Sequence, residues 1–220
     1  MKKSVKPLPA EGKQNRLLVP AGADGLKFTL ERMNKMIVEG SSDSLVVDTA
    51  RVVAAAALDV ASQLGRCIEN RDLVALQGLH AWLHSQFVYM GDPVGVELLQ
   101  MPNRMLRALQ TPELILRPIW EPIADAMAAP HQRASLKPPR PKITGASNEA
   151  VVISLAMAGA LGMRDLTMML GTQKKANPFH YVFGKVKLGD FEIDFDILHA
   201  KFYTRYSFER FAEVPVVFES

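Results

Sequence analysis

The stretch Gly145-Ala-Ser-Asn-Glu-Ala-Val-Val-Ile-Ser-Leu-Ala-Met-Ala-Gly-Ala-Leu-Gly-Met163 decides how the rest of this chain is arranged. From Ser147 onward almost every residue is Ala, Val, Ile, Leu or Met, without the polar stripe of a surface helix. This composition is typical of a helix that is buried on most of its sides. Gly162 ends the pattern in a position that favours glycine, just past a helix C-terminus. We therefore expect a central buried helix over 147–161.

Strand patterns follow this helix along the chain. Short runs rich in β-branched and aromatic residues predict strands at 166–170, 180–188 and 191–198, with further strand material at 202–206 and 214–218. Leu188-Gly-Asp-Phe191 is a two-residue turn signal between two such runs, so the second and third strands are expected to form a hairpin.

Three amphipathic helices are expected before the buried helix. They share apolar residues at helical spacing, and they cover 29–39, 44–65 and 72–87. Ser41, Ser42 and Asp43 are candidate N-caps for the second helix, and Asp72 for the third. Helices first and strands afterwards indicate an α+β fold, in which the N-terminal helices pack on a buried helix against an antiparallel sheet.

Two segments lack this periodicity. Residues 1–25 are rich in Lys, Pro and Gly, and we expect an extended arm that is either a loose tail or ordered against a neighbouring subunit. Residues 103–143 contain seven prolines, which predict a Pro-rich insertion with one short helix at 118–128. The insertion would lie within a single domain that spans 26–220.

The composition argues against several classes of protein. A net charge of +3 is too small to predict specific nucleic-acid binding. The single cysteine, Cys67, excludes an internal disulfide. No apolar run reaches the roughly 18 residues of a membrane span, and the basic start has no apolar core of a signal peptide behind it. His80 and His84 have a spacing that can bind metal on a helix, but no third ligand follows at a useful distance. We expect no metal and no cofactor.

Three polar positions fit a nucleophile, a base and an orienting carboxylate. Ser147 stands at the head of the buried helix, where free N–H groups favour a nucleophile. His180 opens a predicted strand, and Asp194 and Asp196 lie on the next one, so the hairpin can bring an aspartate beside the histidine. Each position also has a purely structural interpretation. Ser147 would then cap the helix, His180 would be a core histidine, and the two aspartates would serve only the hairpin.

The order of these motifs resembles the transglutaminase-like superfamily, which shares its core with papain-type cysteine enzymes. Members carry Gly-Asp-Cys-x-Asp at the head of a buried helix, where this chain has Gly145-Ala-Ser-Asn-Glu149, and Leu161-Gly-Met163 falls where their helix ends. The family's strand that opens with His and an aromatic residue or Val corresponds to His180-Tyr-Val182. Its later Asp is matched best by Asp196, with Asp194 as second choice.

A segment upstream of the core resembles phage-encoded members in particular. It runs Phe87-Val-Tyr-Met-Gly-Asp-Pro-Val-Gly-Val-Glu-Leu-Leu-Gln-Met-Pro102. Such members are small proteins typically found among virion structural genes. The resemblance covers about 30–102 and 144–198, and it implies a location in a virion or in the host cytoplasm, with other virion proteins as partners.

The chain departs from the family at the site itself. Ser147 replaces the nucleophilic cysteine, Ala146 replaces the first Asp and Glu149 replaces the second. A helix N-terminus and an imidazolium can ionise a thiol, but a serine hydroxyl is far too basic for the same surroundings. We therefore expect a vestigial site and a catalytically degenerate fold that serves as an assembly or docking module of a virion. Two alternatives stay open: an active peptidase or acyltransferase using Ser147, His180 and Asp196, and a soluble peptide-binding module that uses the inactive cleft.

Overall fold

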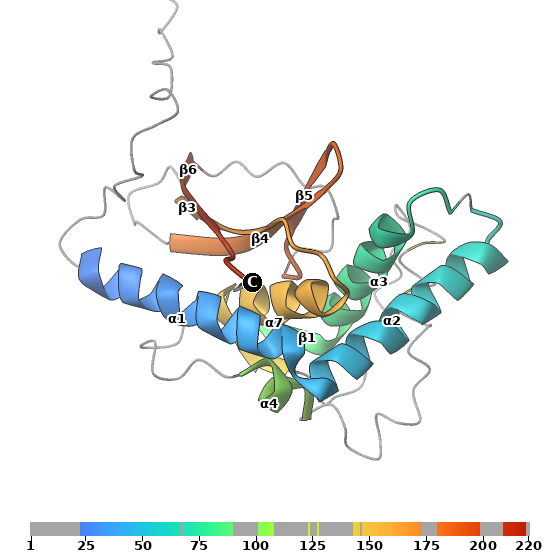
Figure 1. Cartoon of the computed structure of the whole chain (residues 1–220), viewed down its shortest axis with the longest axis horizontal. Coiled ribbons are helices and arrows are strands. Elements are labelled where there is room, and N and C mark those ends of the chain that lie inside the picture. Colours follow the sequence, from blue (N-terminus) through green and yellow to red (C-terminus); the bar gives the residue numbers. More distant parts are fainter. Residues whose placement is uncertain are drawn as a thin grey trace, which may run out of the picture.

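The computed structural model describes residues 23–66, 68–89, 101–107, 123, 127, 143–145, 147–172, 180–198 and 209–218 (Figure 1). Helices come first: α1 (Ala23–Ser42), α2 (Ser44–Gln63) and α3 (Arg71–Gln86). Three short elements follow, β1 (Phe87–Tyr89), α4 (Pro102–Arg107) and β2 (Ile143–Gly145). They lead to the central helix α7 (Ser147–Ala160) and then to the strands β3 (Leu166–Thr172), β4 (His180–Leu188), β5 (Phe191–Phe195) and β6 (Glu209–Pro215).

The four last strands form one antiparallel sheet in the order β5-β4-β3-β6. Helix α7 packs on one face of this sheet, against β4, and α1 packs on the other side of α7 (Figure 1). The predicted α+β architecture is confirmed: N-terminal helices precede a four-stranded antiparallel sheet with a buried helix on it.

Helix α7 is buried all round because each of its sides meets another element. Its contacts include α1, α2, α3, α4 and the sheet. A Cβ on Gly184 of β4 would lie 2.8 Å from Leu155 Cδ2, so the absence of a side chain there lets the helix approach the strand. On the opposite side, a Cβ on Gly159 would lie 3.0 Å from the Cβ of Ser41 in α1. Small residues on both sides thus place α7 at the centre of the molecule.

Helix α7 ends in the left-handed turn that Gly162 predicts. Gly162 has φ +92°, a conformation that costs a glycine little. Its N–H donates to Gly159 O at 3.0 Å, and Met163 N–H donates to Ala158 O at 3.2 Å. These two bonds make a Schellman motif, which satisfies the last carbonyls of the helix and turns the chain into β3.

Several boundaries differ from the sequence-based predictions. Helix α1 begins at Ala23, inside the predicted arm. Asn70, and not Asp72, caps α3, because its side chain accepts from Leu73 N–H at 2.9 Å. The last strand begins at Glu209 and ends at Pro215, so only its end overlaps the predicted 214–218.

The small parallel pair β1 and β2 was not predicted. Three-residue strands carry too little periodicity to be recognised in sequence. Residues 1–22, Cys67 and the predicted strand 202–206 lie outside the described residues. Of the predicted helix 118–128, the structure describes only Ile123 and Met127, which are both helical and buried.

Candidate functional site

Ser147 is the first residue of α7 and is only 2% exposed. Strand β2 ends two residues before it and pairs with β1 in parallel, with Gly145 opposite Tyr89. This pairing fixes the chain as it enters the helix. The serine therefore stands at a helix N-terminus, as predicted, but inside the protein.

The topology brings the start of β4, where His180 lies, to the same end of the helix–sheet layer as Ser147. The turn 161–165 joins the end of α7 to β3, so β3 runs back along the helix, and its last residue, Thr172, pairs with His180. Strand β4 then runs in the direction of α7.

The lengths along the two elements agree with this arrangement. Leu155 lies eight residues after Ser147, a rise of about 12 Å along a helix. Gly184, its close neighbour, lies four residues after His180, a rise of about 13 Å along a strand. The backbone positions 147 and 180 are therefore level with each other. The side chain of His180 is outside the described part of the structure.

Asp196 follows β5 directly and is 4% exposed. One carboxylate oxygen, Oδ1, accepts from Leu198 N–H at 2.9 Å, and the carbonyl of Asp196 lies 2.8 Å from His80 Nε2. Phe195 pairs with Gly184, so Asp196 lies one residue nearer than Phe195 to the His180 end of the sheet. The residue thus belongs to the same end as Ser147, and it also holds the turn that leaves β5.

Asp194, the second choice, lies on the other face of the sheet. It is opposite Lys185, between the buried residues Ile193 and Phe195, which face α7. The side chain of Lys185 is largely buried on this outer face, where Nζ lies 2.9 Å from Glu213 Oε1 and 3.4 Å from Glu192 Oε2. This charged cluster points away from α7, and so does the strand position of Asp194.

Sequence reasoning missed the role of two histidines on α3. His80 is buried, and its Nε2 lies 2.8 Å from the carbonyl of Asp196. His84 Nδ1 lies 2.7 Å from the carbonyl of Ile197. The two imidazole rings are stacked, with their centroids 6.2 Å apart. Each ring nitrogen can donate to its carbonyl, so the pair fastens α3 to the chain leaving β5. The i, i+4 spacing was the available signal, but it cannot reveal a partner more than a hundred residues away.

Neither a metal centre nor a membrane segment is found in the part of the chain that the structure describes. There, no group of three or more His, Cys, Asp or Glu residues has the arrangement of a metal site. Among the same residues, no helix has both the length and the apolar character that a membrane crossing requires. Comparison with known proteins finds no matching family model, no matching curated protein and no matching solved structure.

Proposed function

We propose that this chain is a structural protein of a phage-type virion, in which a transglutaminase-like fold serves as an assembly or docking module without catalysis. The observation that carries the proposal is the burial of Ser147, which is 2% exposed at the head of α7. A nucleophile must meet its substrate within about 3–3.5 Å, and the low exposure of Ser147 favours a role that needs no such approach.

The environment of Asp196 is compatible with a scaffold role. In a catalytic triad the carboxylate orients the histidine. Here Oδ1 of Asp196 accepts from Leu198 N–H, and the main chain of the same residue is fastened to α3 through His80. These contacts hold a turn and a helix in place, which a scaffold needs whether or not it performs chemistry.

The virion context comes from sequence alone. The segment 87–102 resembles phage-encoded members of the superfamily, whose genes lie among those for virion structural proteins. The proposed partners are therefore other virion proteins, in the particle or during its assembly in the host cytoplasm.

Size-exclusion chromatography of the purified chain, alone and with the candidate head, connector and tail proteins encoded beside it, tests the proposal. We expect elution with at least one of them in a defined complex, and the same complex with Ser147→Ala. Elution of the chain by itself in every mixture would contradict the structural role.

One observation favours a second function, an acyltransferase or peptidase that uses Ser147, His180 and Asp196. The backbone positions 147 and 180 are level with each other at one end of the layer, as a nucleophile and its base require. Hydrolysis of an ester, glutamine or peptide substrate that Ser147→Ala abolishes would establish this function instead.

A further inference from the structure

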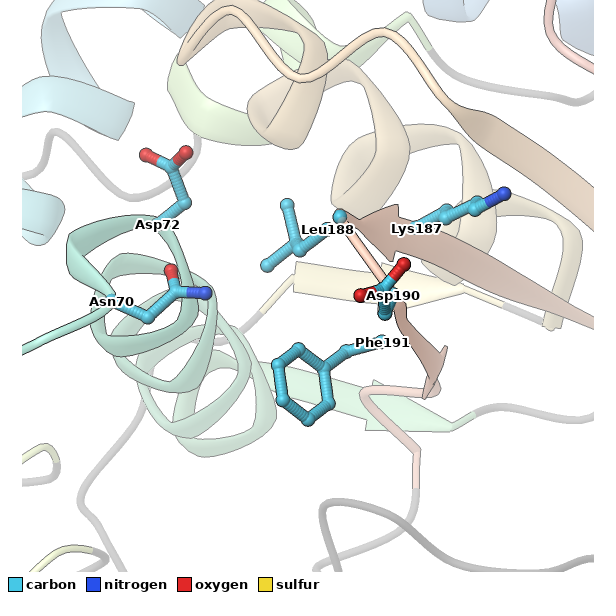
Figure 2. Close-up of a pocket in the computed structure, with 7 residues that line it drawn as sticks. Asn70, Asp72, Lys187, Leu188, Asp190 and Phe191 are labelled. Atoms are coloured by element: carbon cyan, nitrogen blue, oxygen red, sulfur yellow. The ribbon is translucent and has the colours of Figure 1, made fainter.

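A groove opens at the end of the helix–sheet layer opposite to Ser147. It lies between the start of α3 and the turn that joins β4 to β5, and it has a volume of about 480 Å³ (Figure 2). We call it the hairpin groove, and its lining includes Asn70, Asp72, Lys187, Leu188, Asp190 and Phe191.

Local sequence features determine the conformation of each wall of the hairpin groove. Gly189 has φ +60°, which allows the tight turn between Leu188 and Phe191. On the other wall, Asn70 is held as the cap of α3 by its bond from Leu73 N–H. The hydrogen bonds of His80 and His84 hold the C-terminal half of α3 to the chain after β5, so both walls belong to elements that are joined elsewhere.

The chemistry of the groove suits an aliphatic segment next to a cation. Phe191 is 61% exposed, which is high for a residue of its size, and Leu188 points into the space beside it (Figure 2). The side chain of Lys187 extends away from α3 and out of the groove (Figure 2). The two carboxylates of the lining remain, that of Asp72 on the α3 wall and that of Asp190 on the turn wall. The carboxylates of Asp72 and Asp190 therefore favour a partner segment that carries a positive charge.

The arm of this chain carries a segment of that composition. Arg16-Leu-Leu-Val19 places one cation directly before three aliphatic residues, and it follows a stretch that is rich in Lys and Pro. The guanidinium of Arg16 can pair with a carboxylate while Leu17 and Leu18 cover Phe191.

The segment cannot reach the groove of its own chain. Arg16, the first residue of the segment, precedes Ala23, the start of α1, by seven residues, which span at most about 25 Å. The start of α1 lies at one edge of the molecule, and α3 and the β4–β5 turn lie beyond the other end of α1 (Figure 1). Helix α1 has 20 residues and is therefore about 30 Å long. An occupant with this sequence must come from another copy.

We propose that the hairpin groove receives the segment Arg16–Val19 of a neighbouring copy of this chain. The inference rests on the proposed assembly function and names the surface through which copies join. Each copy donates one arm and receives one, so copies join as a pair, as a closed ring or as a helical filament.

Disulfide trapping between two chains tests the proposal on the full-length protein. One chain carries Leu18→Cys and the other Phe191→Cys, and Cys67→Ser in both removes the native thiol. After mixing and mild oxidation, we expect at least about tenfold more cross-linked heterodimer than in a control mixture, because docking raises the local thiol concentration. The control replaces Phe191→Cys by Val217→Cys, at an exposed position (65%) outside the groove. Arg16→Glu should reduce the specific cross-link, and Asp190→Arg on the receiving chain should restore it.

The outcomes separate this inference from the proposed function. Equal cross-linking of the Phe191 and Val217 mixtures overturns the docking of the arm in the groove. If complexes with virion proteins persist in that case, the assembly function stands with a different contact surface. If the chain is monomeric and forms no such complex, both proposals fall.

Discussion

The two ends of the layer formed by α7 and the sheet differ in what they do with their polar groups. At one end, Ser147 and Asp196 are buried, and Asp196 is bound into a turn. At the other, the hairpin groove presents Asp72, Asp190 and a largely exposed Phe191. We call them the closed end and the open end. The residue types that suggest catalysis stand at the closed end, whereas the accessible surface is at the open end.

The cause of the difference is the number of chain segments that meet at each end. At the closed end, β1 and β2 form a ladder just before α7, and the two histidines of α3 bind the chain after β5. At the open end, among the residues that the structure describes, a two-residue turn faces the first turn of α3. The backbone positions 147 and 180 are level with each other at an end where Ser147 and Asp196 are buried.

The largest effect on the free energy of unfolding is expected for an apolar side chain inside the layer, and almost none for one at the open end. Leu155 is 0% exposed against Gly184, and Leu155→Ala should lower the free energy of unfolding by about 2–5 kcal/mol because it leaves a cavity. Phe191→Ala should change it by no more than about 0.5 kcal/mol, since Phe191 is mostly in water. Urea unfolding of both variants measures this, and similar losses would remove the distinction between core and open end.

A smaller effect is expected where α3 binds the closed end. His80→Phe keeps an aromatic ring but removes the donor to the carbonyl of Asp196, and should cost about 1–3 kcal/mol in unfolding free energy. His84→Phe is the matched control and should cost less, because His84 is only half-buried whereas His80 is buried. Thermal unfolding of the two variants gives the order, and a more damaging His84→Phe would show that the closed end is held differently.

A third effect concerns the helix start at the open end. Asn70→Ala removes the side chain that accepts from Leu73 N–H and should cost about 1 kcal/mol. Asp72→Ala, two residues further on, should cost less because only an interaction with the helix dipole is lost. The reverse order in chemical unfolding would restore Asp72 as the cap that its sequence position suggested.

The sequence predicted the elements whose signals are local. An apolar run and Gly162 define α7, and the Gly-Asp pair after Leu188 defines the hairpin. Asn70 was missed because Asn and Asp are equally good caps, and only the register of the first turn distinguishes Asn70 from Asp72. Strand β6 was placed too late because Glu209 and Arg210 at its start lack strand propensity, while pairing with Gly171 and Thr172 of β3 overrides it.

The candidate site was predicted only as far as its backbone. The positions of Ser147 and His180 at one end follow from the order of helix and strands, which the sequence contains. The burial of Ser147 and the bonds of His80 and His84 depend on segments far apart in the chain, so no local pattern encodes them. Asp196 was preferred to Asp194, and strand alternation puts Asp194 on the outer face with Lys185.

The smallest expected effect belongs to the closed end itself. Ser147→Ala removes a hydroxyl from the head of α7 and should change the free energy of unfolding by no more than about 1 kcal/mol, the size of a typical N-terminal hydroxyl contribution. Complex formation with virion proteins should be unchanged. A loss of assembly in this variant, with the fold intact by circular dichroism, would mean that the serine itself contributes to the contact.

A serine-reactive probe tests whether Ser147 acts as a nucleophile in this protein. The native wild-type chain is incubated with a fluorophosphonate, and peptide mass mapping reports modification of Ser147. We expect no modification above that of a His180→Ala control and no turnover of ester, glutamine or peptide substrates, because Ser147 is 2% exposed. Modification of Ser147 that His180→Ala abolishes, together with turnover that Ser147→Ala also abolishes, would contradict the structural account and establish an enzyme.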